Sequence, residues 1–322
     1  MDTLYIVIPA YNESENIKRT IEEWCPVVEK HNGGGASRLV IINDGSRDDT
    51  VKVAKNWGVN YVVNFRMNRG LAKGFMAGLD ACLRNGADII VNTDADDQYC
   101  GDDIEKLVRP ILEEKADIVI GERPIDDTEH FSPLKKKLQH FGSWTVRVAS
   151  KSDIPDAPSG FRAYSRDAAM RLNVTNEYTY TLETIIQAGR TRMAMESVPI
   201  RTNPELRKSR LFSSMFGYVK RSMVTIVRSF MMYKPLRFFL GIGSVLFLCG
   251  ALLGVRFLVY YATGTGNGHV QSLILASILM LMGFQTGVIG LLADIIAANR
   301  KILEDVQYHA RKLDYDREKE EK

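Results

Sequence analysis

The sequence predicts an α/β domain with a mainly parallel sheet, followed by an amphipathic segment and two membrane-spanning helices. Three observations lead to this prediction. Short apolar runs alternate with helical patterns through residues 1–205, which is typical of βαβ units. Apolar residues between 211 and 233 recur at three- and four-residue steps with basic residues between them. Nearly all long uncharged sequence lies after Pro235.

Five apolar runs are predicted to be strands and four longer patterns to be helices. The expected strands are residues 4–8, 39–42, 61–63, 88–92 and 117–120, and the expected helices are residues 15–29, 49–57, 71–84 and 102–113. Strand–helix repetition at this spacing implies parallel strands with helices on both faces. Ligands bind such sheets beyond the carboxyl ends of the strands. The polar residues after each strand therefore form the candidate site.

Two uncharged runs, residues 238–255 and 270–293, are long enough to cross a hydrocarbon core of about 30 Å. Two buried helices of a soluble protein are the alternative, but soluble helices of that length almost always have a polar face. The connecting loop, residues 260–269, contains no Lys or Arg, whereas basic residues flank both runs on their outer sides. The positive-inside rule predicts a protein of the cytoplasmic membrane with both termini in the cytoplasm.

The expected organisation has four parts. These are an α/β domain at residues 1–205, an amphipathic juxtamembrane region at 206–235, a two-helix membrane domain at 236–298 and a charged cytoplasmic tail at 299–322. The juxtamembrane region is predicted to lie in the headgroup plane, the alternative being an ordinary domain helix with a solvated face. A net charge of +3 and four separated cysteines predict no nucleic-acid partner, zinc site or disulfide framework.

Candidate ligand contacts come after the first two strands. An aromatic ring, an amide and a carboxylate suited to holding a base come directly after the first strand, although a turn and an acidic first helical turn would look the same. That run consists of Pro9, Ala10, Tyr11, Asn12 and Glu13. After the second strand, Asp44 is the candidate contact, while Asp48 and Asp49 are expected to cap the next helix.

A basic motif comes after the third strand and an acidic motif after the fourth. Arg69 and Lys73 stand beside glycines at a helix start, where a diphosphate can bind, although the glycines could serve helix packing alone. Asp94 and Asp96 are expected to point the same way, so that their repulsion is relieved by a divalent cation. Oxygen-only ligands, with Gln98 adding one more, favour Mg²⁺ or Mn²⁺.

Together these motifs resemble those of family 2 glycosyltransferases with the GT-A fold. Within that family they are similar to the polyprenyl-phosphate group, which includes dolichol-phosphate mannose synthases and undecaprenyl-phosphate glucosyltransferases. The resemblance extends to G-x-R at 121–123, S-G-F-R at 159–162 and the two C-terminal spans. It implies donor binding by Pro9, Ala10, Tyr11, Asn12, Glu13, Asp44, Lys73, Asp94 and Ala95, and metal binding by Asp94, Asp96 and Gln98. The third acid, Asp97, and R-K-S-R at 207–210 depart from the family pattern.

The chemistry of a polyprenyl-phosphate acceptor leads to the same expectation. Its phosphate is already largely ionised near neutral pH, so a general base is not required. Cations must hold it in line with the anomeric carbon, and arginine forks suit this task. Arg123 and Arg162 are the expected acceptor-phosphate ligands, with Arg210 as a helper. Arg123 and Arg162 are also expected to act with Asp96 in catalysis. Asp156 is expected either to orient one of these arginines or to form a turn.

The function expected from the sequence is transfer of glucose from UDP-glucose to a polyprenyl phosphate, with inversion, on the cytoplasmic face of a membrane. Use of GDP-mannose is one alternative. A membrane-anchored sugar-nucleotide-binding protein without turnover is another. The oligomeric state, including a homo-oligomer, is left open. The polar residues 124–139 are expected to be either a loop that closes over the acceptor or a solvated connection.

Overall fold

The chain forms two compact units in the computed structural model, one of residues 1–226 with 306–322 and one of residues 227–305. The structure describes residues 3–32, 38–59, 61–124, 152–174, 180–203, 224, 227, 231, 235–264 and 270–320. Arg210, nearly all of the predicted amphipathic region and, apart from Pro124, the expected closing loop lie outside these residues. The four-part division into domains stays a prediction.

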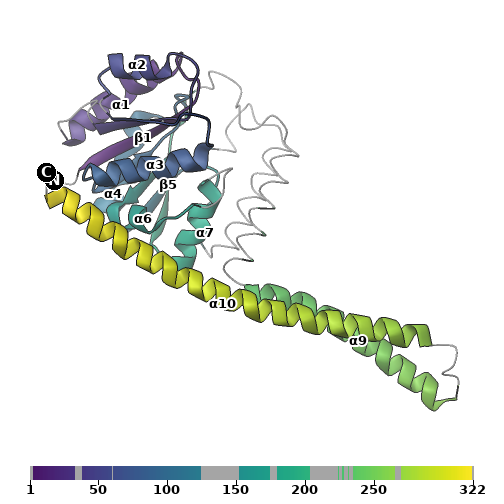
Figure 1. Ribbon diagram of the computed structural model, residues 1–322. Helices are drawn as coiled ribbons and strands as arrows, with labels where there is room; N and C mark the ends of the chain where they lie inside the picture. The colour runs from purple at the N-terminus through teal and green to yellow at the C-terminus, as the bar shows by residue number, and fades with distance from the viewer. Residues whose placement is uncertain are drawn as a thin grey trace. The chain divides into compact units, whose positions relative to one another are not determined.

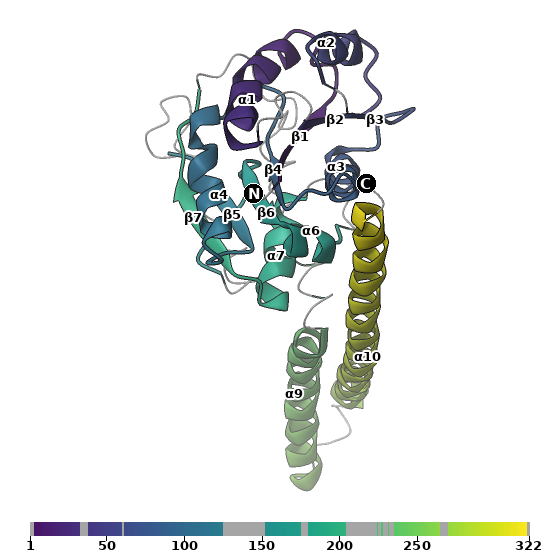
Figure 2. The ribbon, with the colours of Figure 1, turned by 90° about the vertical axis from the view of Figure 1, so that its left-hand side faces the viewer.

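The first unit is built on a seven-stranded sheet with the order β3-β2-β1-β4-β6-β5-β7. Figure 1 shows this sheet among its helices, and Figure 2 labels its strands. The strands are β1 (Leu4–Ala10), β2 (Leu39–Asn43), β3 (Tyr61–Asn64), β4 (Ile89–Asn92), β5 (Ile118–Glu122), β6 (Arg162–Ser165) and β7 (Met195–Pro199). Strand β6 is antiparallel to β4 and β5, whereas the other neighbouring pairs are parallel. The prediction of a mainly parallel sheet is therefore confirmed.

Helices cover both faces of this sheet. They are α1 (Ile17–Asn32), α2 (Thr50–Asn56), α3 (Leu71–Arg84), α4 (Ile104–Leu112), α6 (Arg166–Arg171) and α7 (Thr181–Thr191), with a short 3₁₀ turn at Gly101–Asp103. In Figure 2, α1 and α4 lie on one side of the strands and α3 and α6 on the other. On the α1 side, Ile6 and Ile8 share a buried core with Trp24. On the α3 side, a Cβ atom at Gly78 would lie 2.3 Å from Val7 Cγ1, so this glycine allows α3 to approach the sheet.

The strand order places the candidate site at a crossover point. From β1 the chain adds β2 and β3 on one side and β4 on the other, so the direction of strand addition reverses between β1 and β4. Ligand sites of open α/β sheets form at the carboxyl ends of the two strands flanking such a reversal. Ala10 pairs with Asn43, and Val7 pairs with Asn92. The polar residues after β1, β2 and β4 are thereby brought to one edge.

The first unit also contains the end of the last helix, α10 (Val270–Glu320). Residues 306–320 of α10 pack along α3 and α6 (Figure 1). Tyr315 is 3% exposed, and its hydroxyl donates to Asp80 on α3 at 2.6 Å. Arg311 donates to the carbonyl oxygens of Met170 and Leu172 at 3.1 and 3.0 Å. The end of the predicted tail is therefore part of the α/β unit.

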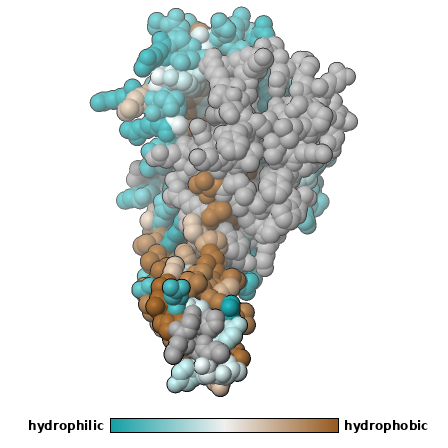
Figure 3. All heavy atoms as spheres, turned by 90° about the vertical axis from the view of Figure 1, so that its right-hand side faces the viewer, coloured by the Kyte–Doolittle hydropathy of each residue, from teal (hydrophilic) through white to brown (hydrophobic). Residues whose placement is uncertain are grey.

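The second unit consists of α9 (Pro235–Ala262) and the first part of α10. Both helices are long and apolar enough to cross a membrane, and little of their apolar surface is buried. Figure 3 shows mainly hydrophobic side chains over this part of the surface. A Cβ atom at Gly243 would lie 2.7 Å from Gly283 O, and one at Gly250 would lie 2.8 Å from Ala276 O. Small residues therefore let the two backbones approach closely, as in membrane helix pairs.

Candidate active site

Hydrogen bonds join the loops after β1 and β2. The Asn12 backbone N–H donates to Ser46 Oγ at 2.9 Å, and its side-chain Oδ1 accepts from the Arg47 backbone N–H at 2.9 Å. The Glu13 N–H donates to Thr50 Oγ1 at 2.9 Å. Tyr11 projects from this joined loop with 40% of its surface exposed. An accessible aromatic ring on a fixed loop is suited to stacking against a planar base.

Asp44 connects the loop after β2 to the start of α3. Its two carboxylate oxygens accept from the backbone N–H groups of Arg69 and Gly70 at 2.7 and 3.0 Å. Gly45 has a positive φ of 74°, and a Cβ atom there would lie 2.6 Å from the Met67 carbonyl carbon. Asp44 therefore fixes the basic motif that the sequence places near a diphosphate. The Lys73 side chain, in the first turn of α3, is exposed.

The acidic pair lies just beyond β4. Burial and the charge of Asp96 raise the pKa of Asp94 to about 7, against the opposing effect of Arg123 and Arg162. Gln98 is held beside the pair, since its backbone N–H donates to Asp96 Oδ1 at 3.3 Å. The structure therefore brings together the three residues that the sequence assigns to the metal.

These residues fit a divalent cation. Burial and the charge of Asp96 both disfavour the ionised form of Asp94, and a bound Mg²⁺ or Mn²⁺ would reduce this electrostatic cost. Within the described ranges no group of three or more His, Cys, Asp or Glu side chains is arranged to hold a metal. A hard cation at this site would therefore take the rest of its oxygen ligands from water and from the diphosphate.

Asp97, the third acid of the motif, has different surroundings. Its φ is +58°, and burial together with the charge of Glu23 on α1 raises its pKa, while Arg19 on the same helix opposes the rise. Its backbone oxygen accepts from Asn203 Nδ2 at 3.1 Å. The main charged neighbours of Asp97 therefore belong to α1, whereas those of Asp94 belong to the site.

Arg123, at the end of β5, lies next to the acidic pair. Its Nε and Nη2 atoms donate to the two carboxylate oxygens of Asp156 at 2.8 and 3.0 Å, and its backbone N–H donates to the same carboxylate at 3.2 Å. Asp156 is buried, whereas the Arg123 side chain is 15% exposed. The negative charge of Asp156 raises the pKa of Arg123 despite burial. Of the two roles considered for Asp156, the geometry supports orientation of an arginine.

Arg162 lies in a different environment from the one expected. It is fully buried at the start of β6. Its guanidinium donates to the carbonyl oxygens of Ala157, Ser159 and Thr181 at 2.6, 2.8 and 2.9 Å and to Thr184 Oγ1 at 2.8 Å. The expected direct contact with a phosphate is not available in this arrangement, because the protein itself surrounds the guanidinium. Its position indicates a role in holding the neighbouring chain.

Four residues outside the expected set lie in a hydrogen-bonded group beside Asp94. They are Asn92, Tyr99, Gly160 and Tyr180, and their hydrogen bonds meet at Gly160. Asn92 and Tyr99 flank the D-A-D-D-Q motif, and Gly160 belongs to S-G-F-R. Their nearness to motifs is a usable signal, but their contacts join residues 20 to 88 positions apart in the chain. Short-range patterns in the sequence do not record such contacts.

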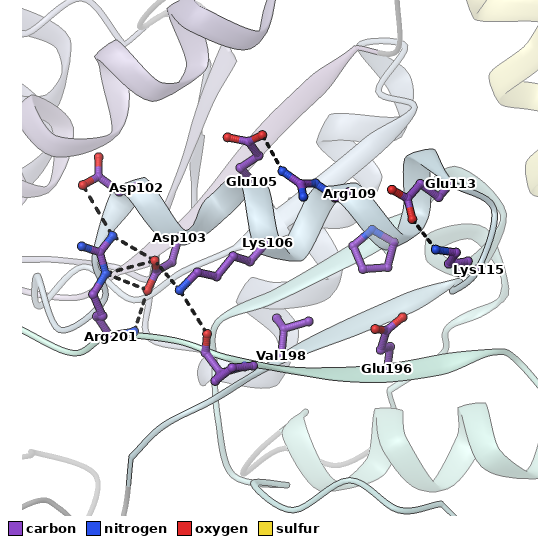
Figure 4. A pocket seen from close by; sticks show the side chains of 12 residues that line it. Asp102, Asp103, Glu105, Lys106, Arg109, Glu113, Lys115, Glu196, Val198 and Arg201 are labelled. Carbon is purple, nitrogen blue, oxygen red and sulfur yellow. Dashed lines mark hydrogen bonds and ion pairs between the residues drawn. The ribbon is translucent and has the colours of Figure 1, made fainter.

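A separate surface pocket lies between α4 and β7 (Figure 4). Its charged side chains are largely paired with one another: Arg109 with Glu105 at 2.9 Å and Lys115 with Glu113 at 2.6 Å. The hydrogen bonds from Arg201 lower the pKa of Asp103 despite partial burial. None of the predicted site residues that the structure describes lines this pocket.

Comparison with known proteins identifies one matching sequence family and several relatives. Residues 5–172 match Glycosyl transferase family 2. The UDP-N-acetylglucosamine–dolichyl-phosphate N-acetylglucosaminyltransferase of Methanococcus voltae is 31% identical over 62% of this chain and 85% of its own. A dolichyl-phosphate beta-glucosyltransferase of Trichomonas vaginalis is 27% identical over 61% of this chain and 63% of its own.

Solved structures add a likeness of fold. Glucosyl-3-phosphoglycerate synthase from Mycobacterium tuberculosis, in complex with Mn²⁺, UDP-glucose and phosphoglyceric acid, matches 71% of this chain and 79% of its own. The TM-score is 0.55 at 20% identity.

Proposed function

Because the chain belongs to glycosyl transferase family 2 and has the GT-A fold, we propose that it transfers one hexosyl unit from a nucleotide diphosphate sugar to a polyprenyl phosphate. The observation that carries this proposal is the carboxylate pair of Asp94 and Asp96 beside Arg123 at the crossover point of the sheet. The two apolar helices and the dolichyl-phosphate acceptors named for both relatives support a lipid acceptor.

The proposed donor is UDP-glucose, with GDP-mannose as the alternative. Tyr11, Glu13 and Asp44 would bind the nucleoside, and Lys73 would approach the diphosphate. Pro9, Ala10, Asn12 and Ala95 would complete the donor site. A divalent cation held by Asp94 and Asp96, with help from Gln98, would neutralise charge on the departing diphosphate.

The proposed reaction is a single displacement. An oxygen of the acceptor phosphate forms a bond to the anomeric carbon as the bond from that carbon to the diphosphate breaks, and the nucleoside diphosphate leaves with both electrons. The anomeric centre is inverted, and no proton has to be removed because the attacking phosphate is already ionised. Arg123 would hold this phosphate in line, since Asp156 fixes its guanidinium.

The proposed location is the cytoplasmic membrane, with α9 and α10 crossing it. The basic residues that flank the two apolar runs favour an active site and both termini on the cytoplasmic side. Nucleotide sugars and the ionised phosphate of the lipid would then meet in water at the membrane surface.

The test is a transfer assay on the purified full-length chain in detergent. Radiolabelled UDP-glucose, UDP-N-acetylglucosamine and GDP-mannose are each incubated with undecaprenyl phosphate and MnCl₂ or MgCl₂, and labelled lipid is extracted into organic solvent. We expect transfer from UDP-glucose and loss of transfer on chelation with EDTA. Transfer from a different donor would correct the sugar, and binding without transfer from any donor would favour the non-catalytic alternative.

A matched pair of variants tests the acidic pair. Asp96→Asn should abolish transfer, because the amide removes a charge needed beside the cation. Asp97→Asn should retain transfer, because the main charged neighbours of Asp97 belong to α1 and an Asn accepts its positive φ. Circular dichroism and melting temperature check that both variants are folded. Undiminished transfer by Asp96→Asn, or in EDTA, would refute the metal assignment.

A further inference from the structure

We propose that Gly160 is a positioning residue for Asp94, because the lack of a side chain at residue 160 allows the Asp94 carboxylate to lie directly against the backbone. The consequence for catalysis rests on the proposed function, whereas the contact is a property of the fold. Three observations carry this inference: the surroundings of Gly160, the hydrogen bonds that hold it, and the anchoring of the segment to which it belongs.

The surroundings of Gly160 explain why a glycine is needed there. Its φ is not among the positive values of this chain, so the backbone conformation does not require a glycine. A Cβ atom at this position would lie 2.8 Å from Asp94 Oδ2 and 3.3 Å from both Asp94 Cγ and Oδ1. These are the three nearest atoms, and all of them belong to one carboxylate. The space that a side chain would need is therefore occupied by Asp94.

Hydrogen bonds hold Gly160 on both sides of its peptide unit. Its N–H donates to the Tyr99 hydroxyl at 3.1 Å. Its carbonyl oxygen accepts from Asn92 Nδ2 at 3.0 Å and from the Tyr180 hydroxyl at 3.3 Å. Asn92, Tyr99 and Tyr180 are all buried, and the ring of Tyr180 is stacked on Phe75 with centroids 4.0 Å apart. Because this backbone is held on both sides, a clash at residue 160 should be relieved by movement of Asp94.

The segment that carries Gly160, residues 156–162, is anchored at both ends. At one end, Asp156 binds Arg123 through two side-chain hydrogen bonds. At the other end, Arg162 joins the carbonyl oxygens of Ala157 and Ser159 to α7. The segment is therefore held rigidly beside Asp94. Arg162 thus has an indirect role: it holds this segment in place and does not contact the substrate.

Gly78 provides a matched control for a glycine in a tightly packed position. A Cβ atom at Gly78 would lie 2.3 Å from Val7 Cγ1, in the core between α3 and β1. Gly78→Ala should therefore disturb packing without reaching Asp94. Comparing it with Gly160→Ala separates the effect on Asp94 from a general loss of stability.

The first experiment is a double-mutant cycle on the full-length chain. Gly160→Ala and Gly78→Ala are each made in the native background and in an Asp94→Ala background, and melting temperatures are measured without metal or substrate. We expect Gly160→Ala to lower the melting temperature only when Asp94 is present, whereas Gly78→Ala lowers it equally in both backgrounds. An equal loss for Gly160→Ala in the two backgrounds would overturn the contact, whether or not the chain is a glycosyltransferase.

The second experiment tests positioning at the metal. Mn²⁺ binding in the presence of UDP is followed through the electron paramagnetic resonance signal of free Mn²⁺. Disturbing residues that orient metal ligands typically costs ten- to a hundredfold in affinity, so we expect Gly160→Ala to weaken Mn²⁺ binding by about tenfold or more. Gly78→Ala should bind Mn²⁺ as the native chain does. Native Mn²⁺ affinity in Gly160→Ala would overturn the positioning role, and failure of sugar transfer by the native chain would refute only the proposed function.

Discussion

Replacing Arg162 by leucine tests whether its guanidinium belongs to the fold or to the substrate site. The residue is fully buried, and its four hydrogen bonds end on three carbonyl oxygens and the hydroxyl of Thr184. Leucine fills part of the volume but donates no hydrogen bond. The substitution therefore leaves four buried acceptors without this donor.

The structure sets the size of the expected effect. Thr181 O still accepts from Thr184 Oγ1, and that hydroxyl still donates to Tyr180 O, so the main losses are at the carbonyl oxygens of Ala157 and Ser159. A buried polar group left without its partner costs about 1–3 kcal/mol, so these two groups destabilise the fold by about 2–6 kcal/mol. Native domains are typically stable by about 5–15 kcal/mol, so Arg162→Leu should be marginally stable. Arg162→Lys keeps the charge and three donors at a single nitrogen, and we expect a loss of about 1–3 kcal/mol, which leaves a folded protein to assay.

Equilibrium urea unfolding of the full-length chain measures this loss. Trp24 is a suitable fluorescent reporter, because it is buried with its ring centroid 5.4 Å from that of Phe161, the neighbour of Arg162. Arg109→Leu is the control, since Arg109 is 63% exposed and pairs with Glu105 on the surface, and its loss should stay within about 0.5 kcal/mol. If Arg162→Leu unfolds like the native chain but no longer transfers sugar, the guanidinium acts on the substrate and the reasoning is wrong.

Other contacts lead to three further predictions. Arg123→Lys should lower kcat/KM for the lipid acceptor at least tenfold with little change in UDP binding by calorimetry, because a single ammonium cannot keep both hydrogen bonds to Asp156 and also hold the phosphate. An equal loss of both would move Arg123 to the donor side. Hydrogen bonds hold the pKa of Asp48 at about 2, below its ordinary 3.8, although burial opposes this. The stabilisation by ionised Asp48 is therefore complete above about pH 4 and is lost as the pH falls towards 2. The melting-temperature difference between the native chain and Asp48→Asn should narrow over that range, and a constant difference would contradict the lowered pKa of Asp48. Tyr315→Phe should speed amide hydrogen exchange in α3, because Asp80 keeps its ion pair with Arg84 but loses the hydrogen bond that ties α3 to α10. Leu313→Ala on the exposed side of α10 should not, and identical exchange in the two variants would contradict docking of the tail.

The first five strands could be predicted because their signals are local. Each is a short apolar run, and the first four precede a helical pattern; parallel strands bring the residues after them to one edge of the sheet. Strand β6 gave no such signal. It has only four residues, begins with the buried Arg162 and is inserted antiparallel between β4 and β5. A charged residue at the start of a short segment is typical of an exposed turn, and only long-range contacts make it a central strand.

The roles of the two arginines show where residue type stops being informative. Both belong to short motifs with a glycine, and both were expected to hold a phosphate. Arg123 keeps part of its surface exposed while Asp156 orients it, whereas Arg162 is enclosed by carbonyl groups from two segments. The sequence shows where the arginines occur along the chain. The burial and partners of each guanidinium in the folded protein then determine whether it can bind a ligand or stabilises the fold.

The tail illustrates the same point over a longer distance. Residues 306–320 come after the second apolar run, and their alternating charges are typical of a solvated helix, yet Tyr308 and Tyr315 are buried against the α/β unit. A chain cut after Arg201 would therefore lose part of this unit together with both apolar helices. Loss of the α10 end from the α/β unit and loss of the apolar helices would each reduce transfer, so poor transfer by such a chain would not distinguish the two causes. Charge reversal within residues 206–235 of the full-length chain keeps both segments, so it is the cleaner test of whether that region brings the active site to the lipid acceptor.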